Sequence, residues 1–455
     1  MLRKTFAILI IAILLASYYV YPLSAPTNGA DMEGRNTAYR IKIKMISQRE
    51  FDVEEDIYVV NKGEQAVDKL LLQVFPKAFA QPSTSPIAAK SYPTGWSAGN
   101  LVVNEVTIGN QHVTPLFEGV LMVLPLNKPI LPGNGKKIKV HFTLKVPKLN
   151  YRFGRYNGMV NLGDWYPVLV PSGREITVYP SVGDPANASV ADYSLNLTIP
   201  QKYTAVTSGI LIEEKNSLLG QKTLSYEGES LRSFAMVLGE NLRIKRSRVG
   251  NTHIEYAFID DQNADVVINT LKDTLSFYEE SFGQYPYAKL TLVETYLSPF
   301  QGVEYPGLIM LASRVINKED TMQRIVAHEV AHQWWYGTVG NDQVREPWID
   351  ESIATYASKL FIEDRLNKDF NFGSDLAATA RAGRIDFLSP VTAFESREEY
   401  LTHVYYGGAM FWTALQHQVG KQELVDFLKD IYIKYHLSEI TTVQLQQEIN
   451  RLVEQ

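Results

Sequence analysis

The pattern of apolar and polar residues changes once along this chain, close to Gly250. Before that point, stretches such as 39–44, 137–144 and 193–199 alternate apolar with polar residues and lie between turns rich in Gly, Pro and Asn. Such alternation places one side of each stretch against a core and the other in water, as in half-buried strands. Because these stretches recur at short spacing, we predict an antiparallel β-sandwich over residues 36–250.

The second part of the chain has mainly helical periodicity. One more strand is predicted at residues 253–259, followed by a helix at 264–282 and by amphipathic helices at 423–435 and 442–452. With 455 residues, of which 45% are hydrophobic and 21% charged, the chain is long enough for two or three domains. We therefore predict a multidomain protein in which residues 251–455 form a mainly helical α+β domain.

A short motif in the second domain points to a metal site. His328 and His332 are four residues apart, so on a helix both imidazoles lie on one face with Glu329 close by. An ordinary helix with polar residues would give the same spacing. Burying two imidazoles and a carboxylate is costly, however, unless the groups are paired or bind a metal, and the surrounding apolar residues predict a buried helix.

The limits of that helix are also predicted from the sequence. Asn317, Asp320 and Thr321 offer side chains that can cap its N-terminus, and Gly337 offers a stop. The helix should then run for about four turns. Its apolar residues lie on one face, so it should pack against the core of the domain.

A third metal ligand is offered by Glu351, which follows the motif along the chain. Two histidines and one glutamate are among the few sets that give a catalytic zinc three protein ligands and one open position. We predict one Zn2+ ion per chain, held by His328, His332 and Glu351. Glu329 would stand beside the metal as a general base.

The composition argues against several other kinds of site. The net charge is −6 and no run rich in Lys and Arg stands out, which argues against a nucleic-acid partner. No glycine-rich loop suited to phosphate stands out either. The chain has no cysteine, which rules out disulfides, thiolate nucleophiles and cysteine-ligated zinc.

The N-terminal residues have the pattern of an export segment. Arg3 and Lys4 precede an apolar run over residues 6–20, as in a signal sequence. The cleavage site is less clear, because the bulky Leu23 stands where a small residue is preferred. We therefore expect residues 1–35 to be a signal peptide or a signal anchor with a linker, which would place the protein on the outer face of the cell membrane or outside the cell.

Several stretches together resemble the aminopeptidase N family of zinc metallopeptidases, the gluzincins. The run 328–337, with residues 348–354 after it, is similar to the zinc signature of that family. Residues 277–287 resemble the helix and turn that lead into its active-site strand. Residues 301–307 resemble its Gly-x-Met-Glu-Asn strand, and residues 405–408 resemble its Tyr-Glu-Lys-Gly segment.

This resemblance implies a fold, an activity and residue roles. The fold would be a β-sandwich followed by a thermolysin-like catalytic domain, and the activity would be that of an aminopeptidase acting on peptides with a free N-terminus. Glu304 would bind the free α-amine, with Gly302 and Val303 beside it on the same strand. Tyr405 would donate a hydrogen bond to the developing oxyanion, and the neighbouring Tyr406 is the alternative.

The chain also departs from the family pattern. Ser358 stands where relatives often carry a glutamate that supports a zinc ligand, and loss of such a group can reduce metal affinity or activity by about 10- to 100-fold. Gln301, Val303 and Tyr305 replace a glycine, a methionine and an asparagine of the amine-binding strand. Typical members continue into a long helical domain that covers the active site. We expect this short member to lack that domain and to have a more open cleft.

Two other functions fit the same motifs. A zinc endopeptidase of the same fold would share the metal site but would not need Glu304 to bind a free amine. A peptide-binding or regulatory relative would keep the fold without turnover. We favour a membrane-associated or secreted zinc aminopeptidase, because every residue that the chemistry requires at the metal is present.

Overall fold

The computed structural model of the chain describes residues 37–171, 173–185, 188–217, 219–260, 262–370 and 385–454. The predicted export segment at residues 1–35 lies outside these ranges. Among the helices of the described ranges, none is both long enough and apolar enough to cross a membrane.

The first part of the chain is built from strands, as predicted, with two short 3-10 helices, η1 (Phe75–Ala80) and η2 (Ala89–Ser91). The strands are β1 (Ala38–Met45), β2 (Glu50–Val60), β3 (Val67–Gln73), β4 (Asn100–Ile108), β5 (Gln111–His112), β6 (Leu116–Glu118), β7 (Leu121–Ile130), β8 (Gly135–Lys145), β9 (Phe153–Tyr156), β10 (Met159–Leu162), β11 (Val168–Leu169), β12 (Ala191–Pro200), β13 (Thr204–Thr207), β14 (Ile210–Asn216), β15 (Gln221–Leu231) and β16 (Met236–Gly239).

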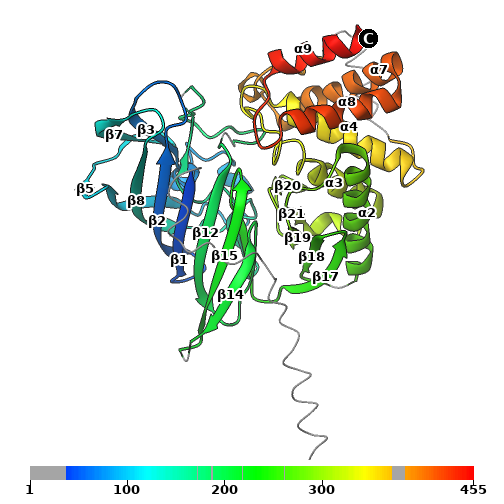
Figure 1. The fold of residues 1–455 in the computed structure, drawn as a ribbon. Coiled ribbons are helices and arrows are strands. Elements are labelled where there is room, and N and C mark those ends of the chain that lie inside the picture. The colour runs from blue at the N-terminus through cyan, green and yellow to red at the C-terminus, as the bar shows by residue number, and fades with distance from the viewer. Residues whose placement is uncertain are drawn as a thin grey trace, which may run out of the picture.

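These strands form one large sheet and two small ones. The large sheet has eight strands in the order β14-β15-β12-β1-β2-β8-β4-β5, and the four-stranded sheets have the orders β13-β16-β10-β9 and β11-β3-β7-β6. The strands β1 and β12 run parallel, whereas β1 and β2 run antiparallel. Figure 1 shows the large sheet lying beside the helices of the second part of the chain.

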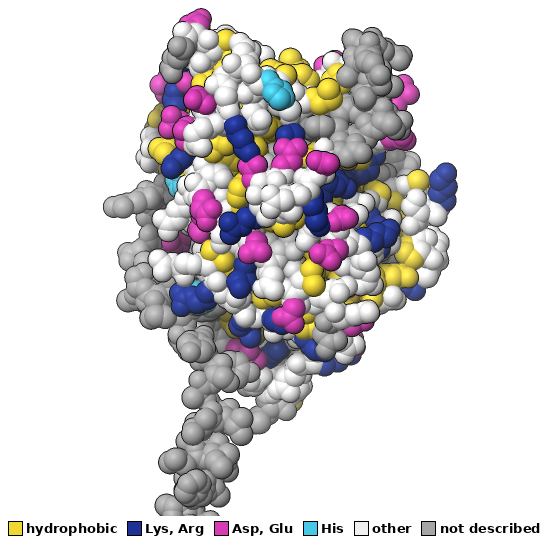
Figure 2. Space-filling view, turned by 90° about the vertical axis from the view of Figure 1, so that its right-hand side faces the viewer, with side chains coloured by type: hydrophobic (Ala, Val, Ile, Leu, Met, Phe, Trp, Pro, Cys, Tyr) yellow, Lys and Arg dark blue, Asp and Glu magenta, His cyan; other side chains and the backbone are white. Residues whose placement is uncertain are grey.

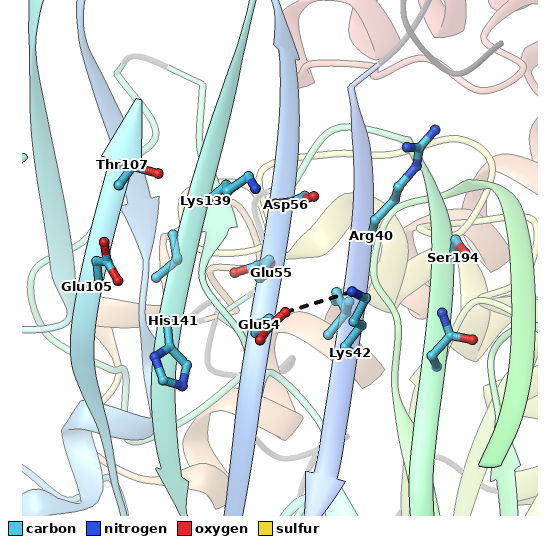
Figure 3. Close-up of a pocket in the computed structure, with 13 residues that line it drawn as sticks. Arg40, Lys42, Glu54, Glu55, Asp56, Glu105, Thr107, Lys139, His141 and Ser194 are labelled. Carbon is cyan, nitrogen blue, oxygen red and sulfur yellow. Dashed lines mark ion pairs between the residues drawn. The ribbon is translucent and has the colours of Figure 1, made fainter. Parts of the chain in front are cut away.

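The two faces of the large sheet differ in polarity, as the alternating sequence predicts. On β1, Ile41 and Ile43 are buried in the core, whereas Lys42 and Lys44 are exposed. The exposed face carries side chains of both signs, and Nζ of Lys42 lies 3.9 Å from Oε2 of Glu54 on the next strand (Figure 3). The shallow hollow of about 650 Å³ on this face is therefore lined largely by charged and polar side chains.

The second part of the chain has a smaller sheet covered by helices. Its five strands have the order β17-β18-β19-β21-β20, and β18, β19 and β21 are parallel to one another. The strands are β17 (Arg243–Val249), β18 (Thr252–Phe258), β19 (Lys289–Thr295), β20 (Gly302–Tyr305) and β21 (Leu308–Ala312), and the helices are α2 (Ala264–Phe282), η3 (Ser313–Val315), α3 (Glu319–Ala331), α4 (Trp348–Asp364), η4 (Val391–Ala393), α6 (Arg397–Tyr400), η5 (Leu401–Gly407), α7 (Gly408–Val419), α8 (Lys421–Lys434) and α9 (Thr442–Val453).

The predicted fold class is confirmed: a β-sandwich is followed by a mainly helical domain with its own sheet. The predicted helix at 264–282 is α2, and α8 and α9 cover the two predicted helices near the end of the sequence. The predicted domain boundary at Gly250 falls in the turn between β17 and β18, two strands of one sheet. The division into residues 36–250 and 251–455 stays a prediction.

The motif helix α3 has 13 residues, close to the predicted four turns, but the predicted cap and stop residues are wrong. The helix α3 begins after Lys318, with no side-chain cap, because Asn317 accepts a hydrogen bond from Asn263 instead. It ends at Ala331 with His332 as its C-terminal cap, well before Gly337. A long-range partner, Asn263, therefore engages the side chain predicted to cap the start of the helix.

A buried arginine joins the two parts of the molecule. Arg232, just after β15, donates hydrogen bonds to the backbone carbonyls of Thr338 and Ser438, and its Nη1 lies 3.3 Å from Oε1 of Glu439. A side chain at Gly340 would clash with this guanidinium, since a Cβ there would lie 2.2 Å from its central carbon. On the face of the helical part shown in Figure 2, acidic and basic side chains are interspersed.

Candidate active site

Three ligand atoms converge where α3 packs against α4. Nε2 of His328 lies 3.1 Å from Nε2 of His332 and 3.2 Å from Oε2 of Glu351. The distance from Nε2 of His332 to the same carboxylate oxygen is 3.3 Å, and all three residues are buried. Ligands held about 2.0–2.2 Å from one tetrahedral zinc lie about 3.3–3.6 Å apart. The three distances, 3.1, 3.2 and 3.3 Å, lie at or just below the lower end of this range, so a small outward shift of the ligands would admit a zinc ion.

Neighbouring groups orient these ligands. Nδ1 of His332 lies 3.0 Å from the carbonyl oxygen of Trp335, which can only accept, so Nδ1 carries the hydrogen and Nε2 is left free to bind a metal. The Tyr405 hydroxyl donates a hydrogen bond to Oε1 of Glu351, which leaves Oε2 directed at the histidines. The donor set and its orientation both suit zinc.

The carboxylate of Glu329 is buried beside this set. Its Oε2 has no hydrogen-bond partner among the described residues. Burial raises the pKa of Glu329 to about 8, and His332 opposes the rise. The carboxylate lies against Gly302, where a Cβ would be only 2.2 Å from its Oε1. Glycine at position 302 thus leaves the space that Glu329 occupies.

A second buried carboxylate, Glu304, lies in the same cleft. Its ligand oxygen lies within 4.8 Å of those of His332 and Asp350. It accepts a hydrogen bond of 3.3 Å from Gln343, whose amide also donates to Asp350 at 2.7 Å. One long hydrogen bond offsets little of the cost of burying a negative charge, so this carboxylate is suited to bind a cation. Val303 lies between Gly302 and Glu304 on β20, but its side chain is buried in the hydrophobic core that the sandwich shares.

The structure distinguishes Tyr405 from its neighbour Tyr406. Tyr405 lies on η5, a π-helical turn, and its ring stacks on His328 with centroids 5.3 Å apart and an angle of 18°. Its hydroxyl is the one that reaches Glu351. Burial raises the pKa of Tyr405 well above the ordinary tyrosine range, so the hydroxyl keeps its proton. Tyr406 also lines the cleft.

Ser358 does not contact the ligands. Its hydroxyl donates to the carbonyl oxygen of Thr355 at 2.8 Å. The group nearest to Nδ1 of His328 is instead the Thr355 hydroxyl, at 3.5 Å, which is a long contact. Of the two histidine ligands, His328 is therefore held more weakly than His332.

The cleft has a volume of about 300 Å³ and receives residues from the sandwich as well. Arg152 and Asp184 form a buried ion pair at its wall, and Nη1 of Arg152 also lies 3.9 Å from Oδ2 of Asp164. The Tyr305 hydroxyl, from the strand that carries Glu304, donates to Asp164 at 3.2 Å. The hydrogen bond from Tyr305 to Asp164 connects these ion pairs of the first part of the chain to the strand that carries Glu304.

The sequence did not identify Arg152, Asp184, Gln343 or Thr355 as parts of the site. None belongs to a short motif, and each reaches the site only through contacts between distant segments. From the sequence one could predict only that a buried glutamate has polar neighbours, and not which residues these neighbours are.

Comparisons with known proteins agree with the geometry. Residues 266–455 match the family model described as the peptidase family M1 domain. Aminopeptidase M1-B of Oryza sativa subsp. japonica is 24% identical over 279 residues, which cover 56% of this chain and 32% of that protein. The tricorn protease-interacting factor F2 of Thermoplasma volcanium is 25% identical over 282 residues, or 57% of this chain and 35% of that protein. The chain thus spans about a third of the length of these curated relatives.

Solved structures share the whole fold. The M1 zinc metallopeptidase of Deinococcus radiodurans has a TM-score of 0.67 at 16% identity, covering 92% of this chain and 91% of that one. A mutant of the same enzyme bound to a Tyr-Ser-Ala substrate has a TM-score of 0.66 at 17% identity, with the same coverage.

Proposed function

We propose that this chain is a zinc-dependent aminopeptidase of the aminopeptidase N-like family of zinc metallopeptidases, because residues 266–455 match the M1 domain and aminopeptidases are among the proteins similar to it. The observation that carries the proposal is that the three converging ligand atoms lie beside the buried carboxylate of Glu304, whose oxygen is within 4.8 Å of the His332 ligand atom. Both His328 and Glu304 line the cleft. The substrates would be peptides with a free N-terminus.

The metal would be held by His328, His332 and Glu351. When bound, zinc polarises a carbonyl group and lowers the pKa of water. Glu329 is placed to take a proton from the attacking water and to pass it to the leaving amine. Its unpartnered Oε2 is the atom available for that transfer.

Two further residues position the substrate. Glu304 binds the α-ammonium group, because among the described residues its buried carboxylate has only the weak hydrogen bond from Gln343. Tyr405 donates its hydroxyl hydrogen to the negative charge that develops on the scissile carbonyl oxygen, once it turns from Glu351. The resulting order along the cleft is amine, scissile carbonyl, leaving group.

A panel of aminoacyl reporters tests this function. Free-amine reporters should be hydrolysed by the zinc-loaded protein, and hydrolysis should collapse when the amine is acetylated or when Glu304 is changed to Ala. Hydrolysis at an unchanged rate after acetylation of the amine and in the Glu304→Ala variant would instead identify an endopeptidase. Zinc binding without turnover of any reporter or peptide would identify a binding protein and overturn the enzymatic proposal.

We also propose that residues 1–35 direct export, which rests on the basic residues and apolar run of that segment. Fusing this segment to a reporter that is active only outside the cytoplasm tests it. An inactive reporter, with the fusion protein present in the cytoplasm, would refute export.

A further inference from the structure

Two arginines in the cleft have no part in the reaction proposed above. Arg324 lies on α3, one turn before His328, and Arg397 begins α6, which leads into the turn that carries Tyr405. Both line the cleft and both are half-buried. Across the part of the chain that the structure describes, neither side chain forms an ion pair or a hydrogen bond.

The position of Arg397 is fixed by packing. Its guanidinium carbon lies 4.4 Å from the centre of the Phe300 ring, and that of Arg152 lies 4.5 Å from the same ring. Arg314 donates hydrogen bonds to the carbonyls of Pro299 and Phe300, so the ring is held in place. A guanidinium held on an aromatic ring keeps its donors free for a planar acceptor.

The charges that line the cleft can be assigned to partners one by one. Arg152 is neutralised by Asp184. Glu304 serves the substrate amine and Glu329 serves proton transfer under the proposed function. Two positive charges, on Arg324 and Arg397, then remain without an acidic partner among the described residues. Half-buried guanidinium groups in a substrate cleft are suited to bind a carboxylate.

We propose that the cleft selects peptides that carry a carboxylate close to the scissile bond, and that Arg324 and Arg397 bind it. This inference rests on the proposed aminopeptidase function. The carboxylate can come from two sources: the side chain of an acidic residue, or the C-terminal carboxylate of a very short peptide. Each source calls for its own matched pair of substrates.

The experiment compares kcat/KM within two pairs that differ only in the carboxylate. Glu-p-nitroanilide against Gln-p-nitroanilide tests an acidic N-terminal residue, and Ala-Ala against Ala-Ala-amide tests the C-terminal carboxylate. The wild type should prefer the carboxylate in at least one pair by about tenfold or more. Arg324→Gln or Arg397→Gln should bring that ratio towards one, and the corresponding Lys variant should keep part of the preference.

The ratio of kcat/KM between the two substrates of a pair separates a defect in carboxylate binding from a general loss of activity. Arg365→Gln removes the same charge at the exposed end of α4, outside the cleft lining, and should leave the ratio unchanged. Wild-type turnover with ratios near one in both pairs, or ratios unaffected in both Gln variants, would overturn this inference alone. If no free-amine substrate is hydrolysed at all, the proposed function fails, and this inference fails with it.

Discussion

At the scale of single residues, the site depends on which buried groups have partners. His332 has a strong carbonyl acceptor and Glu351 has a phenol donor, whereas Glu329 keeps a free oxygen. Partnered groups hold a fixed geometry, and an unpartnered carboxylate can take up a proton. The chemistry of the cleft thus follows from the hydrogen-bond partners of a few side chains.

The first prediction concerns Glu329. Glu329→Gln keeps the shape of the side chain but cannot accept a proton as a carboxylate does, so kcat should fall at least about 10²-fold. Zinc content, measured by elemental analysis, should stay the same. Glu319→Gln, at the exposed start of the same helix, is the control and should retain activity. A Glu329→Gln protein with near wild-type kcat would exclude Glu329 as the base.

The second prediction concerns the weakly held His328. Position 358 lies one turn beyond Thr355 on α4, so a glutamate there can extend towards Nδ1 of His328. We expect Ser358→Glu to raise zinc affinity by about tenfold, measured by competition with a chelator. Ser358→Gln has the same length without the charge and should gain less. Equal zinc affinity of the two variants would show that a carboxylate at position 358 does not strengthen zinc binding.

At the scale of elements, neighbouring residues of one strand meet opposite environments. Glu54 and Glu55 are consecutive on β2, yet Glu54 faces solvent beside Lys42 and Glu55 is buried in the sandwich core (Figure 3). Neither carboxylate oxygen of Glu55 has a hydrogen-bond partner among the described residues. The fold therefore contains a buried acid at an inward-facing position of β2.

The third prediction is a pH dependence of stability from Glu55. Burial raises the pKa of Glu55 well above its ordinary value, so the folded state binds this proton more tightly than the unfolded state. The free energy of unfolding should then fall as pH rises from the unfolded pKa of about 4.3 towards the raised folded value. Glu55→Gln should remove this part of the fall and stabilise the protein at neutral pH.

Urea unfolding at pH 5 and pH 8 measures this effect. Glu55→Gln should gain more than about 1 kcal/mol relative to the wild type at pH 8, and less at pH 5. The neighbouring Glu54→Gln, with an exposed side chain, is the control and should change stability little at either pH. An unchanged pH profile in Glu55→Gln would mean that Glu55 is not the group responsible.

At the scale of the whole molecule, the site is assembled from both parts of the chain. Of the candidate metal ligands, His328 lies on α3, His332 is the C-terminal cap of α3 and Glu351 lies on α4, and an ion pair of the cleft wall comes from the sandwich. Arg232 fixes the two parts together at a second place. A ligand that binds such an assembly stabilises every element that it connects.

The fourth prediction is that zinc removal lowers the thermal stability. Zinc at 100 times its dissociation constant would add about 2.7 kcal/mol to the free energy of unfolding, so a chelator should lower Tm measurably. Scanning calorimetry with and without chelator tests this. In the control variant His328→Ala, the chelator should have a much smaller effect. An equal fall in Tm in both proteins would point to an effect unrelated to this site.

The sequence by itself determined the class of fold and predicted the residues of the candidate metal site, whose ligand atoms lie close together in the structure. Alternation predicted the sandwich strands, and helical periodicity placed α2, α8 and α9. The spacing of His328 and His332 on one helix left little freedom in how they meet, because a helix fixes the positions of residues four apart.

Only the tertiary structure decided what surrounds those atoms. The N-terminal cap of the motif helix was mispredicted because Asn317 pairs with the distant Asn263, and local capping preferences do not include such a partner. Arg152, Asp184 and Gln343 meet the site across long sequence separations. A motif on one helix depends only on the geometry of that helix. The contacts that orient the ligands and balance their charges depend instead on how separate elements pack together.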